Sequence, residues 1–178
     1  GAFGLGFIVP TTRKAGMEVV IANRSGGSTS QMRNLALRDK RRYTLVFLIN
    51  EQRKPKVIRF KKFLFYDEDR EELLSLIAEP RICLVTTALK QGVFTVVPIL
   101  AEAIARRVEA GVEEPLVVLA CEAPTIETSA GLRDKILTAK PGLAPAMLAG
   151  RVSFPSCIVD RICGEPTMQR ATGVVRVE

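Results

Sequence analysis

The chain has 178 residues and a formal net charge of +7, with 47% hydrophobic and 25% charged residues. This length and composition indicate one globular domain with its own core, and they exclude a disordered, collagen-like or disulfide-scaffold protein. No apolar run is long enough to cross a membrane, and no basic signal peptide opens the chain.

The predicted elements alternate between helix and strand. In chain order, the first half is expected to contain helix 4–15, strand 17–22, loop 23–28, helix 29–37, strand 43–49, turn 50–55 and strand 56–66. The second half is expected to contain helix 67–78, strand 81–85, helix 93–110, strand 115–121, helix 125–139, turn or short helix 140–150, strand and loop 152–162, and strand 173–178.

The strands at 17–22, 81–85 and 115–121 are apolar on both faces. Such strands are typical of a parallel sheet that helices cover on both sides. The pattern therefore predicts an α/β fold with a doubly wound, mostly parallel Rossmann sheet, interrupted by an antiparallel excursion around 43–66.

The glycine-rich opening precedes the first predicted helix. Gly1, Ala2, Phe3 and Gly4 fit the second half of a G-x-G-x-x-G dinucleotide fingerprint, in which glycine lets the backbone approach a pyrophosphate. We expect these residues to face the cofactor's diphosphate, with the first strand of the sheet lying before residue 1. Glycines left over from cloning are the alternative explanation.

The second candidate site lies where strand 17–22 ends. A dinucleotide fold usually places an Asp or Glu there to bind the ribose of NAD, but this chain has Asn23, Arg24 and Ser25. A guanidinium suits a 2′-phosphate, which favours NADP over NAD. Alternatively, Arg24 is only a surface loop residue.

The cysteines, the absence of histidine and the basic residues bear on the redox environment, on metal binding and on nucleic-acid binding. The four cysteines form no C-x-x-C pair, which fits a reducing cytoplasm, and the absence of histidine removes the commonest general base and metal ligand, so no metal site is predicted. Basic residues gather in 38–42 and 53–62. A solvated surface explains them best, since the chain has no Trp and only two Tyr to stack on bases, and nucleic acid is an unlikely partner.

Several strings resemble the Rossmann domain of the mannitol dehydrogenase family, the polyol-specific long-chain dehydrogenases. They are Leu84-Val85-Thr86-Thr87-Ala88, Pro98-Ile99-Leu100-Ala101, Pro115 to Glu122 and, most specifically, Phe154-Pro155 with Val159-Asp160-Arg161-Ile162. The resemblance implies hydride transfer between NAD or NADP and a sugar alcohol, possibly phosphorylated. It also implies cofactor contacts at Gly1, Ala2, Phe3, Gly4, Asn23, Arg24, Ser25, Thr86, Thr87, Ala88 and Glu122.

The chain departs from the family pattern at two positions. Ala123 and Ser156 stand where the family commonly has Asn, and the Asn replaced by Ser156 helps to polarise the reacting oxygen. Ser156 is therefore the one candidate catalytic residue in this chain. The family's Lys, Asn and His belong to a C-terminal helical domain, which we expect to lie outside these 178 residues. The alternative to a dehydrogenase domain is a non-catalytic dinucleotide-binding or regulatory Rossmann protein.

Overall fold

The structure, a computed structural model, describes residues 2–26, 28–122, 129–157, 159, 163–169, 172 and 174–177, with only the backbone at 28, 29 and 91. Contacts divide the chain into two compact units. Unit 1 comprises Gly1–Asp69 and Arg161–Glu178, and unit 2 comprises Arg70–Asp160.

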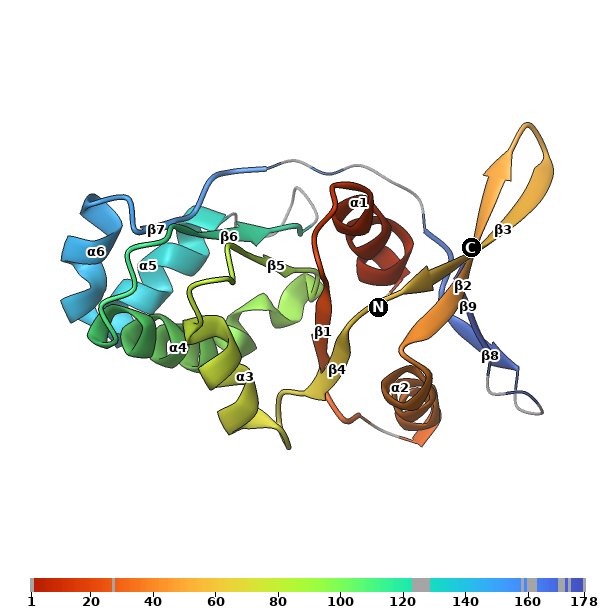
Figure 1. The fold of residues 1–178 in the computed structure, drawn as a ribbon, viewed down its shortest axis with the longest axis horizontal. Helices are drawn as coiled ribbons and strands as arrows, with labels where there is room; N and C mark the ends of the chain where they lie inside the picture. Colours follow the sequence, from red (N-terminus) through yellow and green to blue (C-terminus); the bar gives the residue numbers. More distant parts are fainter. Residues whose placement is uncertain are drawn as a thin grey trace. The chain divides into compact units, whose positions relative to one another are not determined.

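Unit 1 carries two sheets. Its elements are the π-helical segment η1 (Gly4–Ile8), α1 (Val9–Lys14), β1 (Val20–Asn23), α2 (Ser28–Lys40), β2 (Arg42–Ile49), β3 (Gln52–Arg59), β4 (Lys62–Phe65), β8 (Thr167–Gln169) and β9 (Val174–Val177) (Figure 1). Strand β1 pairs in parallel with β4, and the second sheet has the order β3-β2-β9-β8. Strands β2 and β3 form an antiparallel hairpin, and β2 pairs in parallel with β9.

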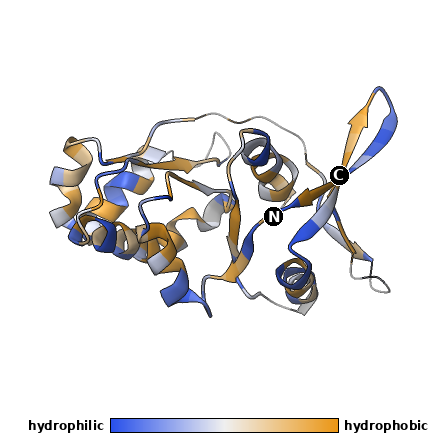
Figure 2. Ribbon diagram, in the orientation of Figure 1, coloured by the Kyte–Doolittle hydropathy of each residue, from blue (hydrophilic) through white to orange (hydrophobic). Residues whose placement is uncertain are grey.

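The core of unit 1 lies between its opening helix and the sheet strands. Leu5 and Val9 are buried against aromatic side chains that include Tyr43, Phe60 and Phe63. The Tyr43 hydroxyl donates a hydrogen bond to the Leu5 carbonyl oxygen, and burial raises the pKa of Tyr43 above its ordinary value. Strand β3 lies at the sheet edge and is exposed along most of its length; near the hairpin turn, Figure 2 shows β3 hydrophilic beside the hydrophobic end of β2.

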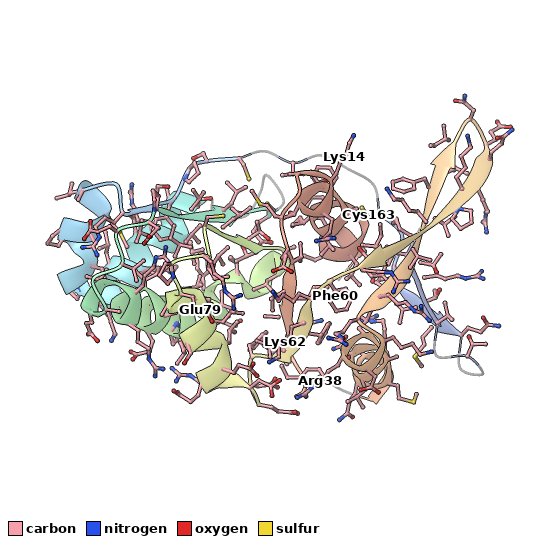
Figure 3. The ribbon with its side chains drawn as sticks, viewed as in Figure 1. Lys14, Arg38, Phe60, Lys62, Glu79 and Cys163 are labelled. Atoms are coloured by element: carbon pink, nitrogen blue, oxygen red, sulfur yellow. The ribbon has the colours of Figure 1, made fainter. Side chains whose placement is uncertain are left out.

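A close approach between helix and strand occurs at Gly6. A Cβ atom at this position would lie 2.8 Å from Cys163 Sγ and 3.3 Å from Val177 Cγ1. Both distances are shorter than ordinary van der Waals contacts, so only glycine fits without movement of its neighbours. Figure 3 labels Cys163 beside the opening helix.

Unit 2 contains a three-stranded parallel sheet and most of the long helices. Its elements are α3 (Arg70–Ala78), β5 (Leu84–Thr87), the 3-10 helix η2 (Lys90–Val96), α4 (Val97–Glu109), β6 (Leu116–Ala120), α5 (Ser129–Ala139), the 3-10 helix η3 (Pro141–Leu143), α6 (Ala144–Leu148) and β7 (Val152–Ser153). The sheet order is β5-β6-β7, and α4 packs against both α3 and α5. The hydrophobic core of unit 2 includes the buried side chains of Ile104, Val118 and Leu132.

Arg107 on α4 is a buried cation that ties two helices together. Its side chain is 1% exposed, and its guanidinium donates to the Ile77 and Glu79 carbonyl oxygens at the end of α3. It also donates to the Glu114 carbonyl oxygen over 2.8 Å. The last carbonyl groups of a helix lack hydrogen-bond donors within the helix. The Arg107 guanidinium supplies donors for some of these carbonyl oxygens at the end of α3.

The α/β class, the mostly parallel pairing and the antiparallel excursion are confirmed. Four of the six pairs formed by the described strands are parallel, and the hydrogen bonds divide the strands among three sheets. Strand β9 falls within the predicted 173–178, whereas the short strand β8 was not foreseen. The part of helix 125–139 before residue 129 lies outside the described residues.

The prediction of a turn over 50–55 followed by one strand over 56–66 is wrong. The turn contains only Asn50 and Glu51, both at positive φ, and the following strand is already paired from Gln52. Pro55 is tolerated because β3 is an edge strand. The chain then leaves the sheet that contains β2 and β3, because the Lys61 N–H donates a hydrogen bond to the Val19 carbonyl oxygen and β4 pairs with β1. The strand expected over 81–85 begins only at Leu84.

Candidate functional site

The carboxyl ends of β1 and β4 lie side by side in unit 1 and bring polar residues together. Asn23 is the last residue of β1, and its carbonyl oxygen accepts a hydrogen bond from the Tyr66 N–H over 3.0 Å. The Arg24 Nε donates to the Tyr66 hydroxyl over 3.1 Å. Ser25 donates its N–H and its hydroxyl to the Asp67 carboxylate, over 2.9 Å and 2.6 Å. We call these five residues, Asn23, Arg24, Ser25, Tyr66 and Asp67, the strand-end cluster.

Electrostatics in the strand-end cluster favour an ionised Asp67. Partial desolvation raises the pKa of this carboxyl, but the hydrogen bonds from Ser25 and the charge of Arg24 outweigh it. The pKa of Asp67 is therefore lower than its ordinary value. The cluster thus presents an exposed guanidinium beside a carboxylate that is already hydrogen-bonded.

The opening helix contributes backbone groups. Ala2 and Phe3 are helical and continue into η1 and α1, so the predicted first helix is confirmed and begins two residues earlier than expected. The first N–H groups of any helix lack partners within the helix and favour anions. Gly1 lies outside the described residues, and Gly4 is the first residue of η1.

A second polar group lies at the carboxyl end of the unit 2 sheet. The Glu122 carboxylate accepts a hydrogen bond from the Thr87 hydroxyl over 2.8 Å. It also accepts hydrogen bonds from the Leu89 N–H and, over 2.7 Å, from the Lys90 N–H. Thr87 and Glu122 are both buried, and this carboxylate caps the start of η2.

The other candidates in unit 2 border the same sheet edge. Thr86 and Ala88 flank Thr87 and are half-buried, and Ser156 is exposed on the segment that follows β7. The next residue, Cys157, reaches the end of β6, where its thiol lies 3.4 Å from the Ala120 carbonyl oxygen. The sheet order β5-β6-β7 explains this gathering, since the carboxyl ends of parallel strands share one edge.

Sequence reasoning missed the contribution of β4. The sequence pattern places Tyr66 at the end of a long strand and Asp67 at the start of a helix, and their contact with Arg24 and Ser25 depends on the parallel pairing of β1 with β4. The one available signal was a polar Tyr-Asp pair directly after the apolar run of Phe63 to Phe65. The close approach at Gly6 was likewise not singled out.

Three positions at which the sequence was compared with the family lie outside the described residues, namely Ala123, Asp160 and Arg161. Within the described ranges, no three Cys, Asp or Glu side chains gather in a way that could hold a metal ion. None of the described helices has the length and apolar character needed to cross a membrane.

The fold defines the class of protein first. The structure superposes on Pseudomonas fluorescens mannitol 2-dehydrogenase, solved as a ternary complex with NAD and D-mannitol, with a TM-score of 0.72 and 18% identity, covering 100% of this chain and 46% of that one. It also superposes on a D-sorbitol dehydrogenase in substrate-free form, with a TM-score of 0.76 and 17% identity, covering 99% and 46%. The chain thus has the Rossmann-like fold of dehydrogenase domains and spans less than half the length of these proteins.

The sequence then gives the family. The profile of the mannitol dehydrogenase Rossmann domain matches residues 1–177, so the chain belongs to that family. A comparison with curated protein sequences gives no match. The resemblance drawn from the sequence is therefore confirmed.

Proposed function

We propose that this chain binds a nicotinamide dinucleotide and serves as the cofactor-binding part of a dehydrogenase that acts on a sugar alcohol. The family membership supports this proposal, and so does the likeness in fold to a mannitol 2-dehydrogenase solved with NAD and D-mannitol and to a D-sorbitol dehydrogenase. The cofactor, when bound, accepts a hydride from the sugar alcohol or returns one to the ketose, and the protein positions it and excludes competing reactions.

The observation that carries the proposal is the strand-end cluster. In a Rossmann fold, the residues that follow the second strand of the fingerprint unit contact the adenosine ribose. Here that position presents an exposed Arg24 held by Tyr66 and a Ser25 held by Asp67. These residues bind the adenosine half, while the opening helix from Ala2 to Gly4 turns its first N–H groups toward phosphate.

Arg24 favours a cofactor with a 2′-phosphate, and Asp67 opposes it. A guanidinium pairs well with phosphate, whereas the Asp67 carboxylate of the same cluster repels it. Ser25 already occupies that carboxylate through two donors, which leaves the Arg24 charge exposed. We therefore keep NADP as the favoured cofactor and NAD as the alternative.

The roles of unit 2 follow from its strand ends. Thr86, Thr87 and Ala88 contact the nicotinamide half in this proposal, and Glu122 fixes their loop through its hydrogen bonds to Thr87 and Lys90. Ser156 donates a hydrogen bond to the reacting oxygen. A Lys, an Asn and a His supplied by a helical domain outside this chain complete the active site. The whole enzyme works in a reducing cytoplasm.

Fluorescence titration with NADH and NADPH tests the binding step. Both cofactors are expected to bind, and NADPH more tightly. Replacing Arg24→Ala should weaken NADPH by about tenfold, the loss of roughly one charge-assisted hydrogen bond, and should change NADH much less. Arg13→Ala also removes an exposed arginine charge, from α1, and serves as the matched control. Equal losses for both cofactors would contradict the 2′-phosphate assignment.

Turnover separates the dehydrogenase from a non-catalytic binding protein. The longest natural polypeptide that contains this chain should oxidise at least one of mannitol, sorbitol or their phosphates with NAD or NADP. Binding of cofactor without turnover on this panel would favour the non-catalytic alternative.

A further inference from the structure

Two thiols meet at the carboxyl end of β6, apart from any role proposed above. The Cys121 and Cys157 sulfur atoms are 3.9 Å apart, which is close to van der Waals contact. Cys121 follows β6 directly, and Cys157 lies four residues beyond the end of β7. Both belong to unit 2, so their separation is set within one compact body.

The backbone holds the two thiols in this arrangement. The Cys121 N–H donates to the Thr87 carbonyl oxygen over 3.0 Å, which extends the pairing of β5 with β6 by one residue. The Cys157 thiol donates to the Ala120 carbonyl oxygen, and β7 pairs with β6 from Leu116 onward. Three neighbouring strands thus position the two cysteines, and a disulfide would bring the sulfur atoms from 3.9 Å to about 2.05 Å.

The two thiols differ in access. Cys121 is 7% exposed, whereas Cys157 is half-buried and follows the exposed Ser156. Burial and the neighbouring Cys157 raise the pKa of Cys121 to about 12, so its thiol stays protonated at neutral pH. Cys157 is the thiol that an oxidant can reach first, and Cys121 is its buried partner.

We propose that Cys121 and Cys157 form a redox-sensitive pair that closes to a disulfide on exposure to a peroxide. The Cys157 thiolate attacks one peroxide oxygen, the oxygen–oxygen bond breaks, and hydroxide leaves and takes up a proton as water. The Cys121 sulfur then attacks the Cys157 sulfenic sulfur, and its proton leaves with the departing hydroxide as a second water. Two thiols and one peroxide thus give one disulfide and two waters.

The disulfide changes the edge that carries Glu122. Cys121 immediately precedes Glu122, whose carboxylate holds Thr87 and the start of η2. A covalent bond from Cys121 to Cys157 ties that position to the segment after β7. The proposal concerns thiol chemistry alone and stands whether or not the chain binds a dinucleotide.

Peptide mapping tests the proposal without relying on any variant. Each cysteine lies in a separate tryptic peptide, namely 82–90, 108–133, 152–161 and 162–170. After incubation of the reduced protein with hydrogen peroxide, the protein should be two hydrogen atoms lighter, and peptides 108–133 and 152–161 should be cross-linked. Dithiothreitol should restore both thiols.

Variants provide the controls. Cys83→Ser removes the most exposed thiol and should leave the cross-link unchanged. Cys157→Ser should abolish it, with both proteins first shown to be folded by circular dichroism. A bond between peptides 152–161 and 162–170, oxidation of Cys83 alone, or a sulfinic or sulfonic acid at Cys157 with no cross-link would each overturn the proposal.

Discussion

At the scale of single residues, the strand-end cluster contains one titrating group whose charge matters to the fold. Asp67 is ionised and accepts hydrogen bonds from Ser25, and these bonds fix the loop after β1. Its pKa is lower in the folded chain than its ordinary value, which is about 3.9 for an unfolded Asp. A depressed folded-state pKa stabilises the fold above the unfolded value, and this contribution is lost as the pH falls through the folded value.

We therefore predict that Asp67→Asn flattens the pH dependence of stability. The free energy of unfolding of the wild type should fall between about pH 5 and pH 2, and the variant should fall less over the same range. Urea unfolding at several pH values measures this difference. Glu68→Gln, at the exposed neighbouring position, is the control and should keep the wild-type slope. Parallel curves for wild type and Asp67→Asn would show that the carboxylate has no such role.

A second prediction at this scale concerns cofactor choice. Asp67→Asn removes the one carboxylate of the strand-end cluster, so a 2′-phosphate near Arg24 is no longer repelled. The ratio of NADPH to NADH affinity should rise by a few fold, within what a screened surface charge contributes. The same fluorescence titration measures it, and a fall in this ratio would place Asp67 among the groups that help to hold the 2′-phosphate.

At the scale of elements, α4 and α3 depend on one buried guanidinium. Arg107 and Arg106 are neighbours on α4, but Arg107 donates to the buried Ile77 carbonyl and to partly buried carbonyls such as that of Glu114, whereas Arg106 pairs with the exposed Glu71 and with Glu102. A buried acceptor left without a donor costs about 1–3 kcal/mol, while an exposed ion pair contributes about 0–1 kcal/mol.

Replacement of each arginine by alanine should separate these effects. We predict that Arg107→Ala lowers the free energy of unfolding by at least about 3 kcal/mol, since it removes the donor of several carbonyls. Arg106→Ala should lower it by about 1 kcal/mol or less. Denaturant unfolding monitored by circular dichroism measures both, and equal losses would be inconsistent with the described role of Arg107.

The loop after β5 allows a similar comparison. Thr87→Val keeps the side-chain shape but removes the hydroxyl that donates to the buried Glu122, so stability should fall by about 1–3 kcal/mol. Thr86→Val alters the half-buried neighbour on the same strand and should cost less than about 0.5 kcal/mol. Thermal or urea unfolding compares them, and a larger loss for Thr86→Val would mean that the Glu122 contact contributes little.

At the scale of the whole molecule, periodicity predicted the class and most elements. Apolar runs such as 115–121 and the acidic first turn of α3 with its Leu73, Leu74 and Ile77 face are local signals, and the structure follows them. Pairing between distant strands is not local. The placement of Lys62 beside Val20, and with it the contact of Asp67 with Ser25, depends on a parallel register that no short window contains.

The same limit explains the errors around 50–66. Basic residues and Pro55 indicated a loop, but an edge strand tolerates both, and the pairing of β3 with β2 decides the outcome. Conversely, the family resemblance extended to candidate positions such as Thr86 and Glu122 that composition could not indicate. Glu122 proved to be buried and bound to Thr87, which the sequence string alone did not reveal.

The central claim, that the opening helix and the strand-end cluster hold a dinucleotide, is tested most directly by nuclear magnetic resonance of the labelled chain during titration with NADPH. The claim predicts that backbone amide shifts concentrate at residues 2–5, 23–25 and 66–67, saturate at one equivalent and shrink in Arg24→Ala. Saturable binding that leaves these amides unchanged, or the absence of any binding of NADPH or NADH to the folded chain, would contradict it.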